Sequence, residues 1–174
     1  MKNIIKKVLL PKMFGESLYI PFVGAIIEKD KDGKKYVLVQ TRQKLTDAKY
    51  SGTLEIPGGK FRAFEDVYET VRREVKEECG LIITEIKDEN KRITVENKDD
   101  ESDLVQPFCV TQMKNGPFVG LIFLCRAKGE PLKETNETKD CRWIEIDELR
   151  RVVKDSPEKI YTAFLGPLKY YLGV

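Results

Sequence analysis

The chain has 174 residues, of which 31 are Lys or Arg, 29 are Asp or Glu, and none is histidine. Because Ser-His-Asp systems, Cys-His systems and helices with paired zinc-binding histidines all need imidazole, the composition excludes them. Acid–base chemistry must come from Asp, Glu, Lys, Tyr, Cys or a metal-bound water. The length suits one domain, and a net charge of +2 argues against a nucleic-acid partner held by excess positive charge.

The four cysteines form no CxxC pair and match no zinc spacing, so we expect reduced thiols in a cytoplasmic protein. The basic start of the chain, MKNIIKKVLLPKMF, lacks the apolar run and the cleavage site of a signal peptide. The longest apolar stretch, residues 19–27, contains Pro21 and Gly24 and cannot span a bilayer. We therefore expect no membrane partner.

The first half of the chain reads as strands followed by one amphipathic helix. Residues 18–29 and 35–42 are rich in β-branched and aromatic residues, and Asp32-Gly33 between them is typical of a hairpin. Residues 53–57 predict a short strand that ends at Pro57-Gly58-Gly59. From about residue 65 to 79 the spacing becomes helical, with an apolar stripe of Phe64, Val67, Tyr68, Val71, Val75 and Cys79.

The second half returns to strands and ends in helices. Strands are expected at 81–86, 92–96, 104–113, 117–127 and 141–146, with a second hairpin turn at Asn115-Gly116. The polar segments 97–103 and 128–140 read as loops. Helices are expected at 147–154 and 157–171. This alternation predicts an α/β fold with helices covering a sheet.

The acids near the end of the first helix lie where helix stability alone disfavours them. On a helical wheel Glu78 falls inside the apolar stripe, Glu74 at its edge, and Glu77 beyond Glu74. The helix C-terminus carries partial negative charge, and like charges four residues apart repel. A divalent cation would reverse these costs, and an all-oxygen set suits Mg²⁺ or Mn²⁺ better than zinc. The alternative is a solvated charged face, which leaves Glu78 unexplained.

Residues 59–81, GKFRAFEDVYETVRREVKEECGL, resemble the Nudix box, G-x5-E-x7-R-E-U-x-E-E-x-G-U, where U is bulky and apolar. All nine defined positions are filled, by Gly59, Glu65, Arg73, Glu74, Val75, Glu77, Glu78, Gly80 and Leu81. The chain departs from many family members at Leu54 and Phe64, which are not defined positions. The resemblance covers roughly residues 18–154, within one domain of residues 1–174 that ends in the helix at about 157–171.

The resemblance implies a Nudix-type α/β/α sandwich, with a mixed β-sheet and a loop–helix–loop catalytic motif. It implies hydrolysis of a nucleoside diphosphate linked to another moiety: a nucleoside triphosphate, nucleotide sugar, ADP-ribose or dinucleoside polyphosphate. Carried over by position, Glu74, Glu77 and Glu78 form the metal-binding set, with the carbonyl of Gly59 or Gly58 completing it. Glu65 and Arg73 form a bracing ion pair. The implied cofactor is Mg²⁺, with Mn²⁺ as a substitute.

The resemblance also implies a mechanism, in which bound Mg²⁺ neutralises phosphate charge and activates a water. Without histidine, the general base should be a glutamate: Glu77, or an acid of the 128–140 loop ahead of Trp143. Glu137 is the first choice on that loop and Glu134 the second. For either loop acid, an ordinary solvent-exposed role is the alternative.

Substrate contacts are less constrained. Arg42 and Arg62 could bind phosphate, although surface charge is the favoured reading of Arg62. Tyr50, Phe108 and Phe118 could stack a base, with core packing favoured for the two phenylalanines. The partner expected is a small-molecule nucleotide, and a homodimer stays possible. The competing functions are a non-catalytic nucleotide-sensing module and a prenyl-diphosphate isomerase on the same fold. The isomerase is disfavoured because such enzymes add histidines to their metal sites.

Overall fold

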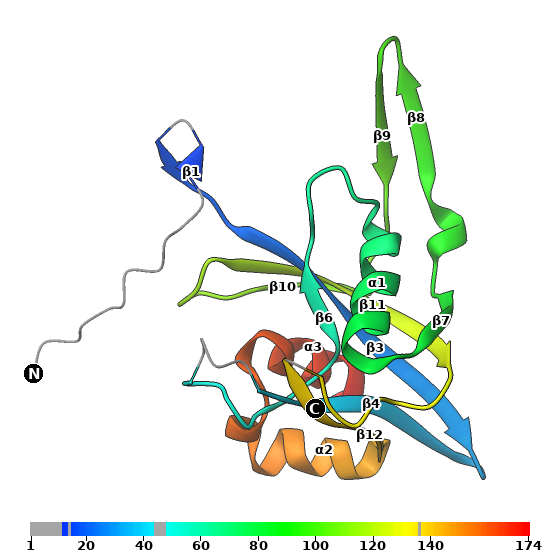
Figure 1. Cartoon of the computed structure of the whole chain (residues 1–174), viewed down its shortest axis with the longest axis vertical. Helices are drawn as coiled ribbons and strands as arrows, with labels where there is room; N and C mark the ends of the chain where they lie inside the picture. The colour runs from blue at the N-terminus through cyan, green and yellow to red at the C-terminus, as the bar shows by residue number, and fades with distance from the viewer. Residues whose placement is uncertain (1–11, 14, 44–47, 136) are drawn as a thin grey trace, which may run out of the picture.

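A mixed β-sheet of eight strands forms the middle layer (Figure 1). The computed structural model describes residues 12–13, 15–43, 48–135 and 137–174, so most of the basic start of the chain lies outside the described residues. Along the sheet the strands run β10 (Cys109–Gln112), β11 (Phe118–Lys128), β3 (Ile20–Lys31), β4 (Lys34–Arg42) and β12 (Thr138–Glu145). Short strands β5 (Leu54–Glu55), β6 (Gly58–Lys60) and β7 (Ile82–Ile86) pair with β4, β3 and β11.

The sheet is mixed because β3 and β11 run parallel, whereas the other pairs are antiparallel. Strand β3 changes its partner along its length: Phe22 to Gly24 pair with β6, and Glu28 to Lys31 pair with β4. The predicted turn at Asp32-Gly33 joins β3 to β4, with φ of 51° and 74° at its two residues. Because the first part of β3 pairs with β6 instead of β4, the glycine-rich β6 lies beside the middle of the sheet.

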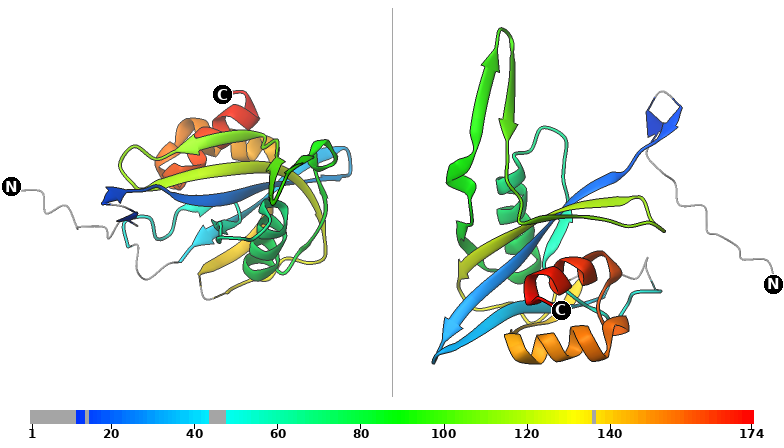
Figure 2. Two further views of the ribbon diagram at one scale, coloured as in Figure 1. Left: turned by 90° about the horizontal axis from the view of Figure 1, so that it is seen from above. Right: turned by 180° about the vertical axis from the view of Figure 1, so that it is seen from behind.

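Helices cover both faces of the sheet, which confirms the predicted α/β sandwich (Figure 2). Helix α1 (Val67–Cys79) packs on one face, and α2 (Ile146–Asp155) and α3 (Thr162–Leu172) pack on the other. Strand side chains alternate between the two faces. Val23 and Ile27 pack with α1, whereas Phe22 and Ile26 pack with α2 and α3. Each face therefore has its own hydrophobic cluster.

The segment 97–103, expected to be a loop, is partly a strand. Residues Asp100–Leu104 form β9 and pair antiparallel with β8 (Ile93–Asn97) in a hairpin that projects from the body (Figure 1). Cross-strand pairing, such as Thr94 Oγ1 donating to Asp103 Oδ1 at 2.6 Å, overrides the weak strand propensity of the acids. The solvated character was correctly predicted, because every residue of both strands is exposed.

Other boundaries also differ from expectation. The strand expected at 104–113 is shorter, because residue 104 belongs to β9 and β10 begins only at Cys109. The last helix begins at Thr162, after a separate 3₁₀ turn at Pro157–Lys159 and an extended Ile160 that bridges to Leu54. Strand β6 and the small pair β1 (Lys12–Met13) and β2 (Glu16–Ser17) were not predicted. Within the described ranges, no helix is long and apolar enough to cross a membrane.

Candidate active site

Helix α1 is capped at both ends by residues within its own sequence. The Asp66 carboxylate accepts the backbone N–H groups of Tyr68 and Glu69 at 2.9 and 3.1 Å, which satisfies free donors of the first turn. Gly80 ends the helix at φ 70°, a left-handed conformation that glycine adopts without a Cβ clash. These caps fix the length of the helix and place its acidic last turns beside β4 and β6.

Glu78 is buried, with 6% of its surface exposed, as its place in the apolar stripe predicts. Its Oε2 accepts two N–H donors, Gln40 Nε2 at 2.8 Å and the Gly58 backbone at 3.0 Å. A carboxylate removed from water is costly unless such donors compensate. The sheet therefore supplies, through β4 and β6, the partners that make a buried acid on this helix tolerable.

Arg73 is the centre of a carboxylate network between α1 and the segment before it, and its side chain is largely buried. Its Nε and Nη2 donate to the two oxygens of Glu65 at 2.6 and 2.9 Å, in the ion pair that the motif implies. Its Nη1 donates to Glu74 Oε1 at 2.6 Å and to Glu77 Oε2 at 3.2 Å. Hydrogen bonding by Arg73 lowers the pKa of Glu65 to about 2, and the same bonds raise the pKa of Arg73. One guanidinium thus donates to three carboxylates.

Gly59 allows Glu74 to reach the backbone of β6. A Cβ added at Gly59 would overlap the carboxylate of Glu74, so the missing side chain is what makes room for this approach. The close packing brings the carboxylate of Glu74 next to the peptide backbone of the glycine-rich strand.

A cavity of about 450 Å³ lies between α1, β6 and the loop before β12. We call it the acidic cavity, and it is lined by Gly59, Lys60, Arg62, Glu74, Glu77, Glu78, Thr135 and Glu137. It brings together the predicted metal-binding set, Arg62 and the first-choice base. The second choice, Glu134, does not line it, and its backbone bridges to Lys139 across the loop.

The chemistry of the acidic cavity fits a hard divalent cation. Its donors are carboxylate and backbone oxygens, the ligands that Mg²⁺ and Mn²⁺ prefer. Across the described ranges, however, no three Asp, Glu or Cys side chains already converge tightly enough to hold an ion. The bonds of Arg73 to Glu74 and Glu77 give a physical reason, since they draw both carboxylates toward the guanidinium. A cation would compete with Arg73 for these oxygens.

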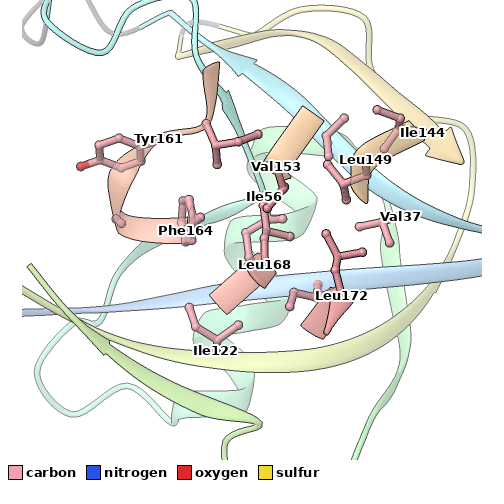
Figure 3. Close-up of a cluster of buried hydrophobic side chains, with 14 of the residues drawn as sticks. Val37, Ile56, Ile122, Ile144, Leu149, Val153, Tyr161, Phe164, Leu168 and Leu172 are labelled. Carbon is pink, nitrogen blue, oxygen red and sulfur yellow. The ribbon is translucent and has the colours of Figure 1, made fainter. Parts of the chain in front are cut away.

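A second cavity, of about 480 Å³, adjoins the first and shares Gly59, Lys60 and Glu137 with it. We call it the aromatic cavity. Its rings come from β3, the 48–53 segment, β11 and the start of α3: Phe22, Tyr50, Phe118, Tyr161 and Phe164. Figure 3 shows Tyr161 and Phe164 next to each other at one end of the buried cluster under α2 and α3.

Arg42 lines the aromatic cavity and not the acidic one. Its Nη1 donates to Glu55 Oε2 at 3.0 Å, and its guanidinium lies 4.4 Å from the centre of the Tyr161 ring. The side chains of Arg42 and Glu55 are only 12% and 3% exposed. This position favours contact with the organic part of a ligand over contact with its phosphates. Phe108, which packs against Tyr170 and Tyr171, lines neither cavity.

Three residues around the two cavities were not predicted from the sequence as site residues: Gln40, Glu55 and Tyr161. Gln40 and Glu55 are buried polar residues within strands, at 0% and 3% exposure. The available signal was a lone Gln in the apolar run YVLVQT and a lone Glu in TLEIP. Buried polar side chains need hydrogen-bond partners. A lone polar residue in a buried strand therefore indicates a site when a helix rich in acids packs against that strand.

Comparison with known proteins gives a consistent picture. The sequence matches the family model described as the NUDIX domain over residues 19–164. No curated protein matches it.

Solved structures share the fold. A NUDIX hydrolase from Nitrosomonas europaea is similar with a TM-score of 0.61 at 20% identity, over 91% of this chain and 72% of that one. A NUDIX-family hydrolase from Clostridium perfringens gives a TM-score of 0.58 at 19% identity, over 89% and 97%. The NUDIX domain of Shewanella oneidensis NrtR, complexed with ADP ribose, gives 0.55 at 17% identity, over 78% and 79%. At such identities the likeness is one of fold.

Proposed function

Since the chain belongs to the NUDIX domain family, we propose that it hydrolyses a phosphoanhydride bond in a nucleoside diphosphate linked to another moiety, with Mg²⁺ as cofactor. The observation that carries the proposal is the continuity of the two cavities. An acidic cavity and an aromatic cavity share Gly59, Lys60 and Glu137. A nucleotide has the same two parts, because an aromatic base and a polyphosphate are joined through a ribose.

The aromatic cavity suits the base. Its volume of about 480 Å³ is within the ordinary range for small-molecule pockets. Tyr50 and Tyr161 meet edge to face, with ring centres 4.9 Å apart, and both line the cavity. Aromatic walls favour flat ring systems, and stacking a base on such a ring contributes about 1–3 kcal/mol.

The acidic cavity suits the phosphates only when a cation is present. Glu74, Glu77 and Glu78 would repel a polyphosphate, and Lys60 and Arg62 on the same wall offset only part of that charge. Family members generally use divalent metal cations, and Glu74, Glu77, Glu78 and the Gly59 backbone would hold one here. Such a cation supplies charge neutralisation on the phosphoryl oxygens and lowers the pKa of the attacking water.

The chain's own residues would then orient the phosphates and remove a proton. Lys60 and Arg62 donate N–H bonds to the phosphate oxygens at the wall of the acidic cavity. We assign the general base to Glu137, whose carboxylate would take the proton of the attacking water. Glu137 borders both cavities, where the phosphates of a nucleotide would pass. Glu77, which is 54% exposed at its side chain, is the second candidate for this base.

A panel of substrates tests the proposal. Nucleoside triphosphates, ADP-ribose, nucleotide sugars and dinucleoside polyphosphates would be incubated with the protein in Mg²⁺, in Mn²⁺ and in a chelator. Chromatography and phosphorus NMR would identify the products. We expect a nucleoside monophosphate or diphosphate product from at least one class, dependent on the metal. Tight binding of a nucleotide without product would instead support the sensing module, and isomerisation of a prenyl diphosphate would support the third function.

A further inference from the structure

Gln40 is a completely buried amide in the middle of β4, with 0% of its surface exposed. Its Nε2 donates to Glu78 Oε2 at 2.8 Å and to Glu55 Oε1 at 3.5 Å. Its Oε1 accepts from the thiol Sγ of Cys79 at 3.2 Å. The Nudix box contains no residue of β4, so this contact lies outside the motif that defines the family.

The orientation of the Gln40 amide follows from its neighbours. Rotating the amide by half a turn would place its carbonyl oxygen against the carboxylate oxygens of Glu55 and Glu78, which accept hydrogen bonds and cannot donate them when ionised. The Cys79 thiol is a donor that lies 3.2 Å from Oε1. The three partners together allow only one orientation.

Gln40 and Gly58 hold the same oxygen of Glu78 from two strands. The amide on β4 and the backbone N–H on β6 both donate to Oε2, at 2.8 and 3.0 Å. A carboxylate has about four acceptor sites on its two oxygens. These bonds therefore fix its direction and still leave it able to bind a cation. Without Gln40, Oε2 would lose the shorter of these two hydrogen bonds.

We infer that Gln40 is the positioning residue of the acidic cavity: it holds the Glu78 carboxylate in the geometry that binds the cation, without touching the substrate. The inference rests on the proposed function, since it assigns Glu78 to a cation site. Partners that orient metal ligands typically contribute about 10–100-fold to metal affinity or activity. The contribution of Gln40 should fall in this range.

The main test is Gln40→Met, which keeps the length of the side chain and removes every hydrogen bond. A matched control is Gln112→Met, because Gln112 is exposed on β10 and donates to Tyr19 outside both cavities. Folding would be checked by circular dichroism and thermal melting. Mn²⁺ affinity would be measured by titration calorimetry without substrate, and kcat and KM with the best substrate of the panel.

We expect Gln40→Met to weaken Mn²⁺ binding and to lower kcat by about tenfold or more, with a smaller change in KM, and Gln112→Met to leave all three unchanged. A folded Gln40→Met protein with wild-type Mn²⁺ affinity and kcat would overturn the inference. If the wild type binds Mn²⁺ but hydrolyses no substrate, the proposed function fails. The affinity comparison still decides the role of Gln40.

A second pair of variants covers the case in which Gln40→Met does not fold. Cys79→Ala removes the donor that orients the Gln40 amide, whereas Cys79→Ser replaces it with a hydroxyl donor. We expect Mn²⁺ affinity to fall in the alanine variant and to recover in the serine variant. Equal affinities in both variants and the wild type would contradict the positioning role.

Discussion

Arg73 holds both oxygens of Glu65 at once, with Nε 2.6 Å from Oε1 and Nη2 2.9 Å from Oε2. Such a bidentate pair is the strongest form of side-chain ion pairing. It ties the segment between β6 and α1 to the middle of the helix. The same guanidinium also donates to Glu74 and Glu77, so the residue that binds Glu65 also contacts two acids of the acidic cavity.

The first prediction is a pH-dependent loss of stability in Glu65→Gln. Because Arg73 lowers the pKa of Glu65 from 4.5 to about 2, this carboxylate stabilises the fold above about pH 4.5. The stabilisation is lost as pH falls from about 4.5 through about 2. Urea unfolding should therefore show a variant less stable than wild type at neutral pH, with a difference that shrinks in acid.

Glu69→Gln is the control for this prediction, because Glu69 is 66% exposed and contacts Arg72 in an ordinary surface pair. Its unfolding midpoint should stay near that of the wild type. If the urea midpoint of Glu65→Gln is lower than that of the wild type by the same amount at neutral and acid pH, the ion pair is not the source of the lost stability.

The second prediction concerns Gly59→Ala. The new Cβ would overlap the carboxylate of Glu74, so Glu74 must move away from β6. We expect a folded protein with weaker Mn²⁺ binding and at least about tenfold lower kcat, a change typical of displaced metal-site groups. Gly166→Ala in α3 is the control, because a Cβ there has nothing within 4 Å. An active, tightly binding Gly59→Ala protein would show that the approach of Glu74 to β6 is dispensable.

The third prediction is that Phe64→Gly stabilises the protein. Phe64, which was expected on the apolar stripe, instead precedes α1 at φ 64°, in the left-handed region, with its side chain fully exposed. The left-handed conformation costs a non-glycine residue roughly 1–2 kcal/mol, and the greater freedom of unfolded glycine offsets about 0.5–1 kcal/mol. The free energy of unfolding should therefore rise by on the order of 0.5–1 kcal/mol. A decrease on urea unfolding would mean that the Phe64 ring has a partner in solution.

The sequence predicted where the acids of α1 lie, but it did not predict which side chains of the sheet contact them. Glu78 could be placed on the buried stripe because helical spacing fixes which residues share a face. The Glu65–Arg73 pair followed from the motif. Gln40 could not be assigned, because its role depends on contacts with Glu55 and Glu78, which lie 15 and 38 residues further along the chain.

The wrong prediction of a loop at residues 97–103 has a similar cause. The acids of residues 97–103 carry low strand propensity, and only pairing with Ile93–Asn97 makes Asp100–Leu104 a strand. Pairing with another strand decides whether such a segment becomes a strand, and the local amino-acid composition does not reveal this pairing. Arg42 also shows this limit: its strand position was predicted, but its contact with Glu55 and Tyr161 depends on β5 and the start of α3.

The fourth prediction tests the aromatic cavity through Tyr50→Leu. Loss of a stacking ring should weaken base binding by about 1–3 kcal/mol, which raises KM by about 5- to 150-fold while kcat changes less. Tyr170→Leu is the control, since Tyr170 is exposed on α3 and lines neither cavity. Equal KM values for the two variants, measured with the best nucleotide, would argue that the base binds elsewhere.

The central claim is that Glu78 belongs to a cation site that drives hydrolysis. Glu78→Gln keeps an oxygen that can accept the N–H groups of Gln40 and Gly58, so the fold should persist. Glu85→Gln on β7 is the control, because Glu85 is exposed and lines neither the acidic nor the aromatic cavity.

The most direct measurement is the rate of nucleotide hydrolysis in Mg²⁺ for wild type, Glu78→Gln and Glu85→Gln, with folding verified by circular dichroism. We expect Glu85→Gln to match the wild type and Glu78→Gln to lose at least about 100-fold in kcat, at or beyond the upper range for disturbed metal sites. A folded Glu78→Gln protein that hydrolyses the nucleotide at the wild-type rate would contradict the account.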